Sequence, residues 1–132
     1  MHTKLDVLIV SPPGDLQIGL QALLNTHLDV DVLVVGESAS ALKVIERHNP
    51  TLVLLDQVNP GNMAAIIVHD IKTINSEIQC IVLVNDDQGR QELIDAGADL
   101  VVIKGLPGAK LVSEIKRLLF GTENYNQKQK GE

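Results

Sequence analysis

The 132-residue sequence contains almost no aromatic residues, since Phe120 and Tyr125 are the only two. Nucleotide bases would therefore find almost nothing to stack on, which argues against binding of single-stranded nucleic acid. The net charge of −6 argues in the same direction, because phosphate backbones attract Lys and Arg side chains. We accordingly expect no nucleic-acid partner, and a core built from aliphatic side chains.

Cysteine is almost as scarce as aromatic residues. Cys80 is the only one, so the chain cannot form an intramolecular disulfide and has no cysteine pair for zinc. Because Cys80 begins an apolar stretch, we expect it to be a small core residue and not a reactive thiol. The motifs G-x-G-x-x-G and G-x-x-x-x-G-K-[ST] are also missing, which argues against a dinucleotide- or nucleotide-binding enzyme.

Long apolar runs are missing as well. No stretch approaches the length needed to cross a bilayer. Residues 1–6 are mostly polar, and the apolar run that follows is too short for a signal peptide. We therefore expect a cytoplasmic protein that has no membrane partner.

What the sequence does contain is an alternation of short apolar runs with segments of helical apolar spacing. Strands are predicted at residues 5–10, 30–35, 51–55, 78–84 and 99–103, and helices at 17–26, 38–48, 63–74, 88–96 and 109–120. This alternation predicts an α/β fold, with a parallel sheet covered by helices on both faces. We expect one domain over residues 1–121, followed by a disordered polar tail at 122–132.

The third predicted strand ends in a carboxylate, Asp56, and the fifth is followed by Lys104. In an open parallel sheet both residues lie at the carboxyl edge, where such folds place ligands. A carboxylate there can act as a nucleophile toward phosphate, with the nearby ammonium stabilising the product. The same two side chains could instead be solvated or form an ion pair that has no chemical role.

Residues of about 5 to 120 resemble the receiver domain of two-component response regulators, the CheY-like family. The similar segments are VLIV at 7–10, LQALL at 20–24, VVGES at 34–38, LVLLD at 52–56 with Pro60-Gly61, AGAD at 96–99 and VIK at 102–104. The resemblance implies a doubly wound, flavodoxin-like sheet of strand order 2-1-3-4-5. It also implies that Asp56 matches the phosphoacceptor, and that Lys104 matches the lysine that contacts the phosphoryl group.

The sequence departs from the family pattern at the metal site. Receivers carry two adjacent acids after the first strand, which hold Mg²⁺, and here Ser11 and Pro12 occupy those positions. Asp56 and the backbone carbonyl of Val58 are what is left of the usual ligands. Asp15 is a conceivable substitute, although its position favours a helix cap. Because Mg²⁺ prefers hard anionic oxygen ligands, we expect Mg²⁺ to bind weakly at best.

Two further departures concern the residues that respond to phosphorylation in the family. The Thr or Ser expected after the fourth strand is matched by Val82 without a gap, or by Asn85 if the loop is shortened. Of these, only the Asn85 amide could donate a hydrogen bond to a phosphoryl group. The aromatic switch residue of the fifth strand is matched by Val101. A valine side chain cannot swing between two environments as an aromatic ring does.

These observations favour a degenerate receiver, a non-enzymatic signalling domain in which Mg²⁺-dependent phosphorylation of Asp56 is slow or absent. Its partner would be a histidine kinase or another signalling protein. By resemblance, the fourth helix, fifth strand and fifth helix form the docking face, which could also support a homodimer. One alternative is a working but atypical phosphoacceptor. The other is a small flavodoxin-like enzyme or cofactor-binding module that uses the same edge of the sheet.

Overall fold

The computed structural model describes residues 5–57 and 63–121. Within these residues, five strands alternate with five helices along the chain. The strands are β1 (Leu5–Val10), β2 (Val30–Val35), β3 (Leu52–Asp56), β4 (Gln79–Val84) and β5 (Leu100–Ile103), and the helices are α1 (Asp15–His27), α2 (Ser38–His48), α3 (Met63–Ile74), α4 (Arg90–Ala96) and α5 (Gly108–Phe120). The predicted tail at residues 122–132 lies outside the described residues.

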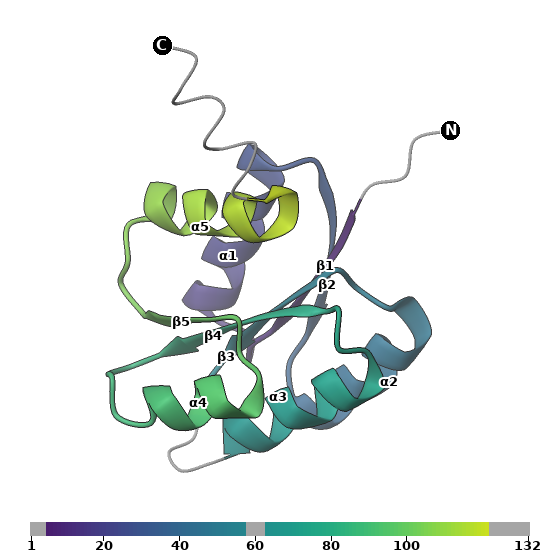
Figure 1. The fold of residues 1–132 in the computed structure, drawn as a ribbon. Coiled ribbons are helices and arrows are strands. Elements are labelled where there is room, and N and C mark those ends of the chain that lie inside the picture. The colour runs from purple at the N-terminus through teal and green to yellow at the C-terminus, as the bar shows by residue number, and fades with distance from the viewer. Residues whose placement is uncertain (1–4, 58–62, 122–132) are drawn as a thin grey trace.

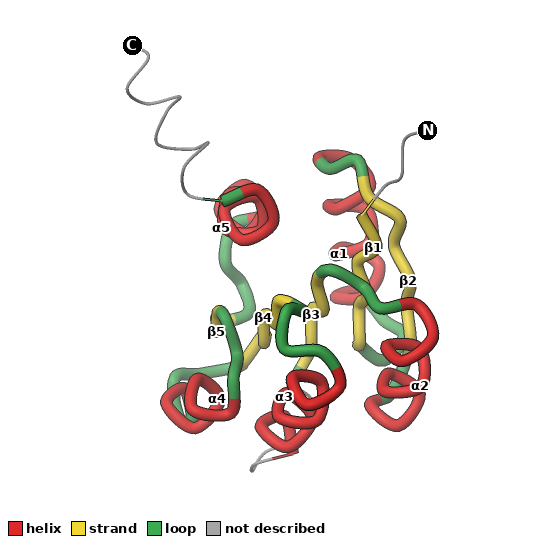
Figure 2. The backbone as a smooth tube through the Cα atoms, turned by 45° about the vertical axis from the view of Figure 1, so that its right-hand side comes forward, coloured by secondary structure: helices red, strands yellow, loops and turns green. Residues whose placement is uncertain are grey.

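The strands form one parallel sheet in the order β2-β1-β3-β4-β5. Helices α1 and α5 cover one face of this sheet, and α2, α3 and α4 cover the other (Figures 1 and 2). The predicted fold class and strand order are therefore confirmed. The order changes direction between β1 and β3, and Asp56 lies at the carboxyl end of β3 beside this switch point.

The sheet separates two aliphatic core clusters. Successive side chains of each central strand point alternately into one cluster and the other. In β3, Leu52 and Leu54 belong to the cluster on the α1 and α5 side, while Val53 and Leu55 belong to the cluster on the other side. Because both faces are covered, successive residues are buried, and the strands read as continuous apolar runs in the sequence. Cys80 is fully buried in the second of these clusters, as expected for a core residue.

The element boundaries differ from the sequence predictions most at the first and fourth helices. The sequence predicts the fourth helix from residue 88, but it begins at Arg90, because Gly89 has a left-handed φ of 86° and acts as its N-cap. The first helix starts at Asp15, with Gly14 as the N-cap and no side-chain capping bond. Asp15 therefore lies in the first turn of α1, where its charge is favourable to the helix dipole.

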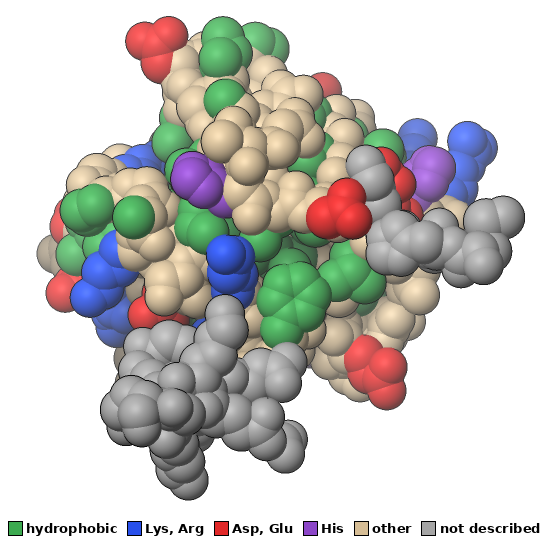
Figure 3. Space-filling model, turned by 90° about the horizontal axis from the view of Figure 1, so that it is seen from above, with side chains coloured by type: hydrophobic (Ala, Val, Ile, Leu, Met, Phe, Trp, Pro, Cys, Tyr) green, Lys and Arg blue, Asp and Glu red, His purple; other side chains and the backbone are tan. Residues whose placement is uncertain are grey.

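The surface on the α1 and α5 side has a mixed character. Seen from this side, the basic side chains of the described residues lie scattered between acidic and hydrophobic ones (Figure 3).

No helix among residues 5–57 and 63–121 is both long and apolar enough to cross a membrane.

Truncating a central core side chain should destabilise this fold strongly. Leu54 is fully buried, so Leu54→Ala should lower the free energy of unfolding by about 3 kcal/mol through lost apolar contacts and a residual cavity. The measurement is urea denaturation followed by circular dichroism. Ile18→Ala is the matched control: Ile18 is 62% exposed on α1, so the loss should be about 0.5 kcal/mol or less. Equal losses for the two variants would contradict the assigned core.

Candidate functional site

Three polar residues meet at the carboxyl edge of the sheet because the ladder of the strands continues past their ends. The Ser11 N–H donates to Val35 O at 3.0 Å, and the Lys104 N–H donates to Val84 O at 2.7 Å. Both backbones therefore stay in strand register, and side-chain alternation continues through them. Each of the three polar residues lies two positions after a strand residue whose side chain faces α1 and α5. These pairs are Ile9 and Ser11, Leu54 and Asp56, and Val102 and Lys104. The three side chains are thus directed to the same side of the sheet.

Asp56 is held by its neighbours through both carboxylate oxygens. The Ser11 hydroxyl donates to Asp56 Oδ2 at 3.0 Å, and Lys104 Nζ lies 2.5 Å from Asp56 Oδ1. Apart from this contact, the buried Oδ1 has no hydrogen-bond partner among the described residues. We treat the contact as an ion pair, because opposite charges attract at this distance whatever the angle. The side chain of Asp56 is 7% exposed and that of Lys104 23%.

Two further contacts fix the partners of Asp56. Gln17 Nε2, on the first turn of α1, donates to the backbone oxygen of Ser11 at 2.7 Å. Lys104 Nζ also donates to the backbone oxygen of Gln57 at 3.1 Å. Ser11 itself is 1% exposed and is the only buried polar residue among those that the structure describes. The sequence reasoning did not single out Gln17, because no motif or spacing links a helix side chain to a carbonyl in the preceding turn.

The remaining predicted site residues are not brought into this group by any described contact. Val82 and Val101 are buried neighbours in the register of β4 and β5. Asn85 is exposed, and no described hydrogen bond joins its side chain to Asp56 or Lys104. Its role toward a phosphoryl group stays a prediction. Val58, whose carbonyl was predicted as a metal ligand, lies outside the described residues.

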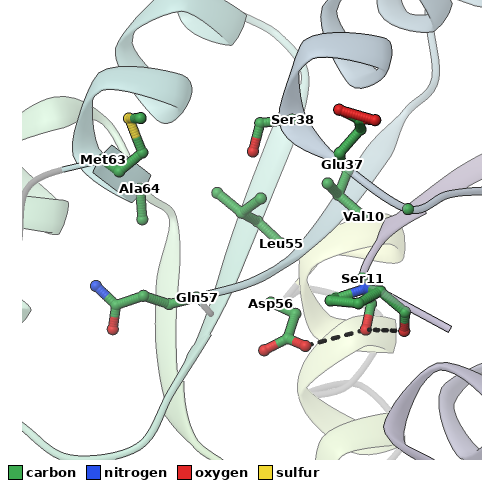
Figure 4. A pocket seen from close by; sticks show the side chains of 11 residues that line it. Val10, Ser11, Glu37, Ser38, Leu55, Asp56, Gln57, Met63 and Ala64 are labelled. Atoms are coloured by element: carbon green, nitrogen blue, oxygen red, sulfur yellow. Dashed lines mark hydrogen bonds between the residues drawn. The ribbon is translucent and has the colours of Figure 1, made fainter. Parts of the chain in front are cut away.

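A cleft of about 190 Å³ opens beside Asp56, between the ends of β1, β2 and β3 and the start of α3. Figure 4 shows its lining, with Ser11 bonded to Asp56 at one end and Glu37 and Ser38 at another. Among the described residues, the carboxylates that line it are those of Asp56 and Glu37. No group of three or more His, Cys, Asp or Glu among the described residues could hold a metal ion. Because Mg²⁺ binds through one or two carboxylates and completes its octahedral shell with water, Asp56 and Glu37 are the described carboxylates that this cleft offers to such an ion.

The opposite edge of the sheet contains a second charged group, near the start of β4. Lys72 Nζ lies 2.8 Å from Asp99 Oδ2, which also accepts the backbone N–H of Cys80 at 2.7 Å. Burial raises the pKa of the Cys80 thiol to about 12, with Asp99 adding to this effect and Lys72 opposing it. The thiol therefore stays protonated and inert at physiological pH.

The strand order and the two helical layers define a doubly wound α/β protein of the flavodoxin-like class. No protein-family model matches the sequence. Among solved structures, the chain is similar to the receiver domain of the sensor histidine kinase PA1611 from Pseudomonas aeruginosa, with a TM-score of 0.77 and 19% identity over 88% of this chain and 98% of that one. That structure has a magnesium ion coordinated in its active-site cleft.

Two other solved structures agree with this similarity. A putative response regulator from Chloroflexus aurantiacus has a TM-score of 0.80 and 19% identity, over 89% of this chain and 98% of its own. The chemotaxis protein CheY4 from Vibrio cholerae has a TM-score of 0.78 and 16% identity, over 89% of this chain and 100% of its own. The chain therefore has the fold of CheY-like response-regulator receiver domains.

Removing Lys104 should destabilise the protein, because it leaves the buried Asp56 carboxylate without its cation. We expect Lys104→Met to lower the free energy of unfolding by about 2 kcal/mol, a value reduced from that of a fully buried pair because Lys104 is partly exposed. Asp56→Asn in the same chain should recover much of this loss. A double-mutant cycle measured by urea denaturation gives the coupling between the two residues.

The control is the ion pair between Glu114 and Arg117 within α5, whose side chains are 28% and 40% exposed, more than those of Asp56 and Lys104. The same cycle with Glu114→Gln and Arg117→Met should give a coupling of about 0.5 kcal/mol or less, because i,i+3 pairs on one helix contribute little. A coupling for Asp56 and Lys104 no larger than this control would contradict the buried pair.

The Cys80 thiol should be protected from modification in the folded protein. Because it is fully buried and its pKa is raised to about 12, we expect almost no reaction with an aromatic disulfide reagent at pH 8. The reaction should become complete when the protein is unfolded in urea, where the thiol has an ordinary pKa and full access. Stoichiometric labelling of the folded protein within minutes would show that Cys80 is accessible.

Proposed function

We propose that the chain is a receiver-type signalling domain in which Asp56 is retained but is not phosphorylated at an appreciable rate with Mg²⁺. One observation carries this proposal. The position that should provide an acid beside Asp56 is Ser11, whose hydroxyl donates a hydrogen bond to the Asp56 carboxylate. The place of a metal-binding carboxylate is thus taken by a neutral hydroxyl group that donates to Asp56.

The electrostatics of the site support this proposal. Transfer of a phosphoryl group to a carboxylate brings two anions together, and a divalent cation normally screens their repulsion. Here the one positive charge in contact with Asp56 among the described residues is Lys104. A Mg²⁺ ion placed at this carboxylate would find no second acid after β1, which lowers its affinity.

A domain of this kind would signal through protein contacts. By resemblance the docking face consists of α4, β5 and α5, and the partner is a histidine kinase, another signalling protein or a second copy of the chain. Each of these three elements has one exposed large hydrophobic residue, namely Ile94, Ile103 and Phe120.

A second candidate function is a working phosphoacceptor, which the direct pairing of Asp56 with Lys104 favours.

An enzyme or a flavodoxin-like cofactor module has less support. The cleft beside Asp56 measures about 190 Å³, and another, between α1 and the start of α5, about 240 Å³. Both are smaller than the roughly 300 Å³ at which sites for drug-sized ligands and cofactors begin.

A titration with beryllofluoride, a phosphoryl mimic, and millimolar Mg²⁺ tests this proposal. Because the site lacks the second acid, we expect no saturable amide shifts around Asp56 in two-dimensional NMR spectra. Asp56→Asn is the control and should give the same spectra with and without the reagents. Saturable shifts in the natural chain that disappear in Asp56→Asn would overturn the proposal and support the working phosphoacceptor.

The paired variant Ser11→Asp with Pro12→Asp supplies the missing acids and provides the positive control. It should gain saturable shifts with Mg²⁺ around residues 11, 12 and 56, provided that its spectrum shows a folded protein. If the variant is folded and does not respond, the acidic pair is not what the natural site lacks, and the argument from Ser11 fails.

A further inference from the structure

Helix α4 is the shortest helix of the described residues and depends on contacts at its ends. It has seven residues, of which only Leu93 is buried. Its N-cap, Gly89, has a left-handed φ of 86° and forms no side-chain capping bond. Because a helix of this length is not stable by itself in water, tertiary contacts must hold it in place.

At the N-terminal end, Arg90 joins α4 to the neighbouring strand. Its Nη1 donates to the backbone oxygen of Val101 in β5 at 3.0 Å. The Nε and Nη2 atoms both donate to Asp87 Oδ1, at 2.9 and 2.7 Å. The planar guanidinium thus spans from the turn before α4 to the strand beside it. Lysine, which has a single amine nitrogen, could not reproduce this arrangement.

At the C-terminal end, the chain is held by backbone geometry and by Lys72 of α3. Gly97 has a φ of 120°, and a Cβ there would lie 2.9 Å from Lys72 Cγ. The Ala98 N–H donates to Leu93 O at 3.0 Å, which closes the helix. Lys72 Nζ also donates to Ile78 O at 2.7 Å and pairs with Asp99 at 2.8 Å. A Cβ at position 97 would be strained at this φ and would force the Lys72 side chain to shift, so this side chain of α3 packs closely against the end of α4.

The two ends differ in how far they are shielded from water. Side-chain exposure is 40% for Arg90 and 65% for Asp87, but only 19% for Lys72 and 27% for Asp99. Water competes better for the exposed pair, so the N-terminal end is the weaker attachment. We infer that Arg90 is a latch that holds the N-terminal turn of α4 against β5, and that this turn opens before the C-terminal end does.

The Arg90 latch affects the protein surface at α4 and is separate from the group of residues around Asp56. By resemblance, Val101 occupies the position of the aromatic switch residue of the receiver family. Its backbone oxygen accepts the hydrogen bond from Arg90, and this bond connects α4 to β5. Opening of the turn would move Ile94, an exposed residue of α4. Neither Asp56 nor Lys104 takes part, so the latch does not depend on the proposed function.

Amide hydrogen exchange of the whole chain, followed by NMR, tests the latch. The Leu93 N–H donates to Gly89 O at 3.1 Å. In Arg90→Met this amide should exchange about ten-fold faster, because the charged hydrogen bonds of Arg90 no longer hold the turn closed. The Ala98 N–H should change by less than about two-fold, since the C-terminal attachment is intact. Arg90→Lys should resemble Arg90→Met, because the bond to Val101 needs the guanidinium.

Arg117→Met is the matched control. Arg117 forms the same i,i+3 pair with Glu114 on α5, where its two described bonds both go to Glu114. It should leave the Leu93 and Ala98 amides unchanged. Amides of the core strand, such as Ile81, report global unfolding and should accelerate by no more than Leu93 does in Arg90→Met, because the bonds of Arg90 are lost once in either kind of opening. No acceleration at Leu93, or equal acceleration at Leu93 and Ala98, would overturn the inference.

Discussion

The alternation of side chains along parallel strands is the constraint on which both the core and the site depend. It sends Leu52 and Leu54 to one aliphatic cluster and Val53 and Leu55 to the other. The same alternation, continued by one residue, directs Asp56 to the side of α1 and α5. Because all strands run in one direction, their carboxyl ends share an edge, and residues distant in sequence become neighbours there. The site is therefore an extension of the core pattern beyond the strand ends.

Within that site, the balance of charge decides what chemistry is available. One carboxylate meets one ammonium and one hydroxyl, so the group as a whole is close to neutral. A buried ion pair of this kind adds little net stability compared with apolar residues, although breaking it is costly. The pair is thus better explained by the need to position Asp56 than by stability. Ser11 supplies a hydrogen bond to Asp56 but no charge that would attract a cation.

The sequence allowed most of the fold to be predicted and only part of the site. The apolar runs marked all five strands, and the helical spacing marked all five helices, because burial on both faces leaves a strong pattern. The strand order came from the resemblance to receivers. Asp56 and Lys104 were found as residues at strand ends. The bond from Gln17 to the carbonyl of Ser11 was missed, since a bond between a helix side chain and the preceding loop leaves no periodic signal.

The sequence by itself thus determined the secondary structure, the aliphatic character of the core and the identity of the residues at the carboxyl edge. These properties follow from local spacing and composition, which act over a few residues. Only the tertiary structure decided that the Ser11 hydroxyl bonds to Asp56, that Lys104 reaches the other oxygen, and that Arg90 joins α4 to β5. Such contacts depend on strand register and crossover geometry, which bring together atoms that are far apart along the chain.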